Sequence, residues 1–176
     1  MRKLIGASVV ALLIGAFAIP ASASTQTIDA TLGSTLAMTA TPSSSVSWTL
    51  ASSGANTTSG GSMTINSNQP YIVSVTADKT KMTEYVTASS AYATGTPKTL
   101  TTALTVQSVR SAGTAVVAGV GSNAVVGTST LAATGTGLGT DTYDETLSQP
   151  TLITDSALPA GETYHIQLTY TASSTL

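Results

Sequence analysis

The chain contains no cysteine, and only 8% of its 176 residues are charged, against roughly 25% in an ordinary soluble domain. The lack of cysteine excludes disulfides, thiolate metal sites and a cysteine nucleophile. Without Arg2 and Lys3, which belong to a predicted leader, four cations stand against eight carboxylates, a net charge of −4. Four scattered cations are too few for a nucleic-acid surface, so we expect no nucleic-acid partner.

Polarity in this chain comes from hydroxyl groups, since threonine makes up about a fifth of the residues. Threonine and valine favour pleated, half-buried surfaces, whereas glycine and serine favour turns. No amphipathic helix is evident beyond the leader. The composition predicts an all-β protein, a single antiparallel β-sandwich that is either jelly-roll-like or immunoglobulin-like.

The first 23 residues have the three parts of a secretory signal peptide. Arg2 and Lys3 are the positive start, residues 4–19 the apolar run, and Ala21-Ser22-Ala23 the small-residue cleavage site. The apolar run is short for a bilayer span of about 20 residues, although an uncleaved anchor is the alternative. We therefore predict cleavage after Ala23, a secreted or cell-surface protein, no membrane span after removal of the signal, and one mature domain over residues 24–176.

Apolar and polar residues alternate over residues 28–40, directly after the leader. This pattern predicts a long N-terminal strand with one dry face. The apolar face is the predicted subunit interface, with the positions Ile28, Ala30, Leu32, Leu36 and Met38. The strand needs a sheet to cover it, which either its own chain or a neighbouring copy can supply.

Further alternation predicts strands over 46–50, 71–77 and 164–172. Residues 77–97 are predicted to form a long loop with one short strand. Residues 146–154 are a weaker strand, which Pro150 places at a sheet edge or bulge. Strands and turns spaced near a dozen residues apart are typical of a sandwich or barrel.

Several patterns suggest chemistry but each has a simpler explanation. Residues 119–124 match G-x-G-x-x-A, yet Val125-Val126 follow, where a nucleotide site needs a helix. Asp141, Asp144 and Glu145, beside Tyr143, could hold Ca²⁺, although a solvated acidic loop is the expected structure. We therefore predict no cofactor and no metal.

Several single residues also have both a functional and a structural interpretation. Glu84, Glu145 and Glu162 would permit a two-carboxylate glycosidase, without any specific motif for it. His165 is expected to be exposed on a polar strand face, and Trp48 to lie in the core beside Val46 and Leu50. Asn56-Thr57-Thr58 is an N-x-T sequon, so Asn56 is a predicted glycosylation site.

Two local patterns resemble those of secreted cell-surface families. Trp48-Thr49-Leu50 is a W-x-L sequence, and residues 160–170 (AGETYHIQLTY) resemble the A-G-x-Y-x-x-x-L-T-[WY] end of W-x-L-type proteins, with Tyr170 in place of the second tryptophan. Similar endings occur in fimbrial and biofilm-matrix subunits. The resemblance implies a prokaryotic extracellular β-sandwich, in some cases assembled into fibres by a strand donated between subunits.

The sequence thus predicts a non-enzymatic subunit of an extracellular filament, pilus or surface coat. Its partners would be copies of itself or other surface proteins, joined by the strand over residues 28–40. The alternative is a monomeric adhesin or carbohydrate-binding module, with ligand contacts at Tyr85, Tyr92, Tyr143 and the Asp141 cluster.

Overall fold

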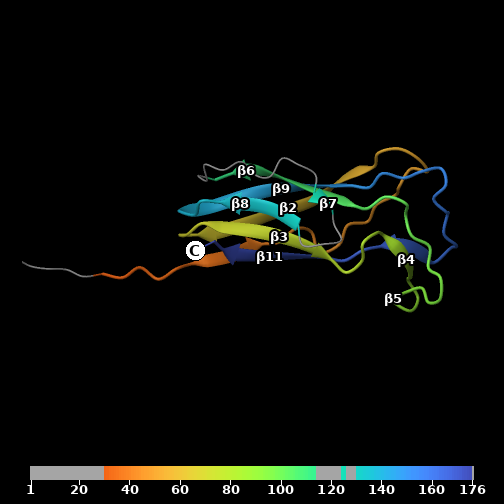
Figure 1. Cartoon of the computed structure of the whole chain (residues 1–176), viewed down its shortest axis with the longest axis horizontal. Coiled ribbons are helices and arrows are strands. Elements are labelled where there is room, and N and C mark those ends of the chain that lie inside the picture. Colours follow the sequence, from red (N-terminus) through yellow and green to blue (C-terminus); the bar gives the residue numbers. More distant parts are fainter. Residues whose placement is uncertain (1–29, 114–123, 126–129, 176) are drawn as a thin grey trace, which may run out of the picture. The chain divides into compact units, whose positions relative to one another are not determined.

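The computed structural model describes residues 30–113, 124–125 and 130–175, and every regular element in these residues is a β-strand. The strands form three antiparallel sheets (Figure 1) with the orders β1-β2-β9-β6-β7, β11-β3-β8 and β10-β4-β5. The strands are β1 (Leu36–Ala40), β2 (Thr57–Ser67), β3 (Tyr71–Ala77), β4 (Thr83–Val86), β5 (Ala91–Tyr92), β6 (Thr105–Ala112), β7 (Ala124–Val125), β8 (Thr130–Gly135), β9 (Gly139–Ser148), β10 (Glu162–His165) and β11 (Leu168–Ser174). The all-β prediction is confirmed.

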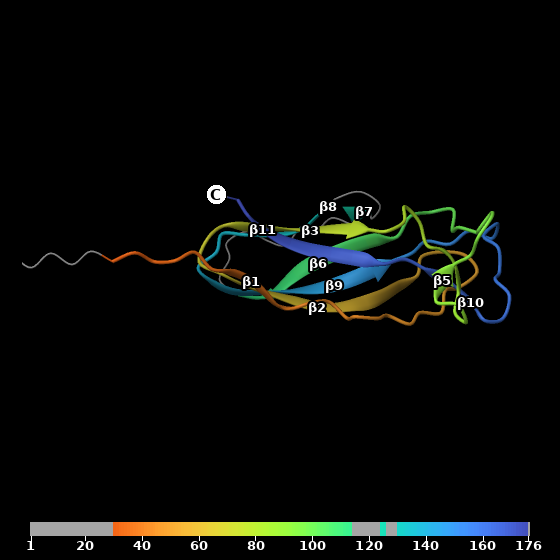
Figure 2. The ribbon, with the colours of Figure 1, turned by 90° about the horizontal axis from the view of Figure 1, so that it is seen from below.

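The central strands of the two larger sheets pair with strands distant in the sequence. β9 lies between β2 and β6, with Glu145 opposite Gly61 on one side and Ser108 on the other. β3 lies between β11 and β8, with Val75 opposite Tyr170. Figure 2 shows β3 and β11 on one side of this part of the molecule and β2 and β9 on the other.

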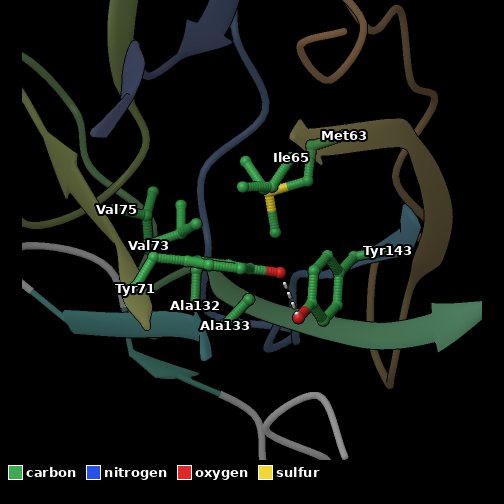
Figure 3. Close-up of a cluster of buried hydrophobic side chains, with 8 residues drawn as sticks. All are labelled: Met63, Ile65, Tyr71, Val73, Val75, Ala132, Ala133 and Tyr143. Carbon is green, nitrogen blue, oxygen red and sulfur yellow. Dashed lines mark hydrogen bonds between the residues drawn. The ribbon is translucent and has the colours of Figure 1, made fainter. Parts of the chain in front are cut away.

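The main hydrophobic core is shared by the two larger sheets (Figure 3), because alternate side chains of each strand point inward. β2 and β9 contribute residues from one sheet, and β3 and β8 from the other. Two sheets that share a core face each other, which is consistent with the predicted sandwich. The buried residues are Met63, Ile65, Tyr71, Val73, Val75, Ala132, Ala133 and Tyr143.

A second, smaller core lies where the chain passes from the large sheets to the small sheet. Leu104, Val106 and Leu147 are its buried members. Partly buried side chains that pack against it are Trp48, Ala77, Ile166 and Leu168. Trp48 is thus partly buried against this core, whereas Val46, predicted beside it, is exposed, and residues 46–50 form no strand.

The predicted strand over 71–77 coincides with β3, whereas three other segments differ from the prediction. Residues 77–97 contain two short strands, β4 and β5. The predicted strand over 164–172 is two strands in different sheets, β10 and β11. The strand predicted over 146–154 instead ends at Ser148, and Thr151 beyond Pro150 makes an isolated bridge with Gly54.

The predicted N-terminal strand over 28–40 is represented by β1, which begins only at Leu36. Residues 30–35 are exposed and lie outside any strand, and Ile28 lies outside the described residues. The chain divides into two units, residues 1–32 and residues 33–176. The leader over 1–23 and the glycine pattern over 119–123 also lie outside the described residues, while Ala124 begins β7 rather than a helix. Within the described part, no helix is long and apolar enough to cross a membrane.

Candidate functional site

A cavity of about 760 Å³ opens between two stretches of backbone at one side of the larger sheets. One border is residues 41–46, which follow β1, and the other is residues 164–170, which run from β10 into β11. Both borders line the cavity with consecutive residues. Residues 41–46 lie in no strand, whereas residues 168–170 belong to β11, which is an edge strand of its sheet in the described residues. We call this cavity the edge groove.

The border over 41–46 touches the edge of β2 at a pair of glycines. The Ser43 N–H donates to the Gly60 carbonyl at 2.8 Å. Gly61 has a φ of +95°, and a Cβ atom there would lie 2.7 Å from the Ser43 nitrogen. A larger residue at Gly61 would therefore be strained and would push this border away.

The floor of the edge groove is apolar, with one carboxyl group in it. Leu104, Leu147 and Leu168 line it together with Trp48. Among the described residues that line it, Glu145 is the only acidic one, and none is a lysine or arginine. Such a surface suits an apolar occupant with few charges.

The Glu145 carboxyl is 2% exposed and is held by hydroxyl groups. Tyr170 Oη donates to Oε2 at 2.8 Å, and Ser108 Oγ donates to Oε1 at 3.4 Å. Burial raises the pKa of Glu145 from 4.5 to about 7, against the opposing effect of these hydrogen bonds. Glu145 is therefore a group that changes charge near neutral pH inside a groove.

The strand at the edge of the groove is incompletely covered. β11 has β3 as its only ladder partner in the described residues, although β1 contacts it without pairing. Its inward side chains, Leu168, Tyr170 and Ala172, are half-buried, whereas Tyr71, Val73 and Val75 of β3 are at most 1% exposed. In the described residues, a sheet of three strands thus faces a sheet of five. The smaller sheet has room for a further strand only beside one of its edge strands, β11 or β8.

The N-terminal side of β1 is fixed at the turn between β2 and β3. Asn68 Oδ1 accepts the Thr35 N–H at 2.7 Å, and its Nδ2 donates to the Gly33 carbonyl at 2.8 Å. Asn68 follows the end of β2, whereas the edge groove meets β2 at Gly60. The segment before β1 and the edge groove therefore lie toward opposite ends of β2.

The structure separates the predicted interface residues into two groups. Leu36 and Met38 pack against the chain's own main core. Ala30 and Leu32 are exposed, and 88% of the Leu32 surface is accessible. The half of the predicted strand that begins at Leu36 thus closes its own sheet, and only the half before it is left for a neighbour.

The predicted acidic loop over 141–145 is wrong, because these residues belong to β9. Alternation places Asp141, Tyr143 and Glu145 inward and Asp144 outward, where Asp144 accepts the Ser62 hydroxyl at 2.7 Å. Among the described residues, no group of three His, Asp or Glu side chains could hold a metal ion. The suggested Ca²⁺ site is therefore not formed.

Asp141 and Tyr143 belong instead to a buried polar cluster in the main core. Tyr71 Oη donates to Asp141 Oδ2 at 2.6 Å and lies 2.9 Å from Tyr143 Oη. Tyr143 Oη donates to the Thr134 carbonyl at 2.8 Å. Burial raises the pKa of Tyr71, and its hydrogen bond to Asp141 adds to this. Tyr143 is 0% exposed, so it is not available as a ligand contact.

Asn56 is a structural bridge in the folded chain. Its Oδ1 accepts the Ala51 N–H at 2.7 Å, and its Nδ2 donates to the Gln149 carbonyl and the Thr151 hydroxyl, both at 3.1 Å. The residue is 8% exposed. A glycan on Nδ2 would displace these contacts, so the folded structure disfavours the predicted glycosylation, which stays untested.

Three aromatic rings meet on the small sheet next to the edge groove. The His165 ring stacks on Tyr85 at 4.3 Å, and Tyr92 meets the edges of both rings. Tyr92 Oη donates to Asp78 Oδ2 at 2.6 Å, and Lys79 Nζ lies 4.5 Å from the centre of the Tyr92 ring. His165 is thus half-buried among rings, rather than exposed as predicted, because β10 places it beside β4 and β5.

The three glutamates that would permit a two-carboxylate glycosidase lie on three different strands. Glu84 and Glu162 lie on the neighbouring strands β4 and β10, and Glu145 lies on β9 of another sheet. Burial raises the pKa of Glu162, and the neighbouring Glu84 raises it further. Glu84 accepts the Lys98 N–H at 2.7 Å. This contact holds the segment around Lys98 to β4, while strand pairing joins β10 to β4.

Comparison with protein-family models, with curated proteins and with solved structures gives no match to this chain. The two features of this chain that bear on its function are therefore the edge groove and the segment before β1. Sequence patterns did not reveal the groove, because its borders come from segments more than 100 residues apart. Alternation over 141–147 was the available signal that Glu145 points inward.

Proposed function

We propose that the chain is a non-enzymatic structural subunit of an extracellular filament or surface coat, which assembles by donating the segment before β1 to a neighbouring copy. The observation that carries this proposal is the exposed apolar residue Leu32 in a segment whose polar and apolar residues alternate like those of a strand. A side chain of this kind gains most from a covered site on another chain.

The position of the segment supports an open polymer. It joins the body at Asn68, whereas the edge groove lies toward the other end of β2. A contact between different surfaces of two copies repeats head to tail and produces a filament unless the rotation closes a ring. The low charge of the chain also leaves few groups that would block pairing of strand edges.

The test compares two charge substitutions on adjacent residues. Leu32→Asp places a carboxylate on the apolar face of the segment, and Thr31→Asp places the same charge on the opposite face. Both residues are exposed, so neither substitution should unfold the body. The readout is negative-stain electron microscopy and light scattering of residues 24–176 over a concentration series.

We expect the unchanged chain and Thr31→Asp to form filaments. Leu32→Asp should raise the concentration needed for assembly roughly 100-fold, because burying an unpaired charge costs about 3 kcal/mol or more. Single particles at every concentration of the unchanged chain, or equal assembly by the two variants, would overturn the proposal.

A monomeric adhesin that binds a carbohydrate is the second candidate, favoured by the aromatic lining of the edge groove. Trp48 and Tyr164 line it, and both also line a second cavity of about 520 Å³. Aromatic faces of this kind can stack on sugar rings. This function predicts that Tyr164→Ala abolishes binding to a glycan array, while Leu32→Asp leaves that binding unchanged.

A further inference from the structure

We propose that the edge groove is the acceptor site, in which residues 28–32 of a second copy pair with the open edge of β11 as a fourth strand of its sheet. The proposal rests on the proposed function and adds to it the site that receives the donated segment. It commits to one occupant, a second copy of this chain.

The two borders of the groove suit an extended segment. Residues 168–170 of the edge strand β11 line the cavity, and residues 41–46 line it opposite them. Within the described residues, one backbone hydrogen bond joins 41–46 to β2, from Ser43 to Gly60. An extended segment in the groove can pair its N–H and carbonyl groups with the edge of β11. A compact ligand would leave those groups without partners.

The unequal sheets indicate which strand lacks a neighbour. A fourth strand beside β11 would cover the half-buried side chains of Leu168 and Tyr170 and would reduce the difference between five strands and three. The incomplete burial of β11, next to an almost fully buried β3, is what a missing neighbouring strand produces.

The chemistry of the lining matches the donated segment. The apolar residues Ile28, Ala30 and Leu32 would face the leucine-lined floor, while Asp29 and Thr31 would face solvent. The described residues of the lining include one carboxyl group, at Glu145, and no lysine or arginine, so an acidic side chain is disfavoured there. The alternation of the segment keeps Asp29 away from Glu145.

The reach of the chain argues for a second copy rather than the chain's own segment. Asn68, which holds residues 33–35, and Gly60, which lines the groove, are eight residues apart in the sequence, which corresponds to about 26 Å in an extended strand. An extended chain advances at most about 3.6 Å per residue. Residues 26–32 of the same chain would be used up in spanning this distance and could not also fill the groove.

Disulfide trapping in this cysteine-free chain tests the acceptor site. One variant of residues 24–176 carries Thr31→Cys, which would lie on the outer face of the donated strand. It is mixed with each of three variants with a cysteine on the outer face of β11 or just before it, Gln167→Cys, Thr169→Cys or Thr171→Cys, all exposed positions. Three positions cover the possible registers, since paired strands allow a disulfide only when the Cα atoms lie within about 7 Å.

The matched control is Thr146→Cys, an exposed threonine on the outer face of β9. After mild oxidation, we expect covalent dimers on non-reducing gels with one or two of the β11 variants. Their yield should exceed that of the control on the order of tenfold or more, because a docked segment has an effective concentration near millimolar. Addition of excess peptide 24–35 should lower that yield.

The outcomes separate this inference from the proposed function. Filaments that form without preferential trapping at 167, 169 or 171 would overturn the acceptor site and leave strand donation standing. Absence of both filaments and trapped dimers would overturn the two together. If Thr146→Cys gave the same yield of disulfide-linked dimers as the β11 variants, the disulfides would come from random collisions between chains. That result would also overturn the acceptor site.

Discussion

Glu145 shows how a single residue links the interior of this protein to pH. The carboxyl group lies in an apolar floor with two hydroxyl donors, so its neutral form is favoured in the folded chain. In the unfolded chain the group is ionised above about pH 4.5. The folded state therefore binds a proton that the unfolded state has released.

We predict that the free energy of unfolding falls as the pH rises from about 4.5 to about 7, and is flat above. The contribution of Glu145 is fully present below pH 4.5 and is lost as the pH rises through its folded pKa. The loss is on the order of 3 kcal/mol, since one pKa unit corresponds to about 1.4 kcal/mol. Urea unfolding of Glu145→Gln should show a much shallower slope, because the amide does not titrate.

Asp144→Asn is the matched control for that measurement. Asp144 is the adjacent carboxylate on the outer face of β9, and it accepts one hydrogen bond from Ser62. It should keep the full slope of the unchanged chain. If Glu145→Gln kept that slope as well, another group would be responsible for it.

At the scale of elements, the break between β10 and β11 is fixed by Asp78. Its Oδ1 accepts the Gln167 N–H at 2.8 Å, and its own N–H donates to the Gln167 carbonyl at 3.1 Å. Its Oδ2 accepts the Tyr92 hydroxyl at 2.6 Å. One side chain thus connects the junction of two strands with the aromatic cluster of the small sheet.

We predict that Asp78→Ala destabilises the small sheet selectively. Loss of both acceptors should cost about 2–3 kcal/mol, because each lost charged hydrogen bond leaves a donor without its partner. Amide hydrogen exchange should accelerate in β4 and β10, while β3 and β9 of the main core keep their protection. Equal acceleration in all four strands would show that the small sheet does not open independently.

Residues 71–77 and 164–172 show what alternation in a sequence can and cannot predict. Residues 71–77 have apolar residues at every second position and are buried in a central strand, so pattern and structure agree. Residues 164–172 keep their alternation across the break, because Ile166, Leu168 and Tyr170 still face the cores. The break itself depends on Asp78, almost 90 residues away, and no local pattern contains it.

The prediction was wrong for two acidic residues that the structure buries beside tyrosines. Asp141 and Glu145 suggested a solvated loop, yet tyrosine hydroxyls donate to both inside the two facing sheets. Residues 46–50 alternate because Trp48 packs against the second core, although no strand pairs with them. The edge groove depends on tertiary pairing, so the sequence could suggest only the segment around Leu32 that we propose to be donated, and not the groove itself.

At the scale of the whole molecule, low charge and unequal sheets point to assembly through apolar contact. The mature chain is expected to carry a net charge of −4, and the lining of the edge groove has one carboxyl group and no lysine or arginine. Contacts between copies should then depend weakly on salt, because screening acts only on charges. Burial of apolar surface weakens on cooling, since its driving force near room temperature is entropic.

We therefore predict that filaments withstand a rise in salt from about 0.05 M to about 0.5 M and shorten or dissolve on cooling from about 37 °C to about 4 °C. The measurement is sedimentation of assembled chain at each condition. Repulsion between copies of like charge is screened by salt, so a small gain in assembly at high salt is expected. Filaments that dissolved in salt and survived cooling would show that charge pairs join the copies, and Leu32 would then not be the group that binds the neighbour.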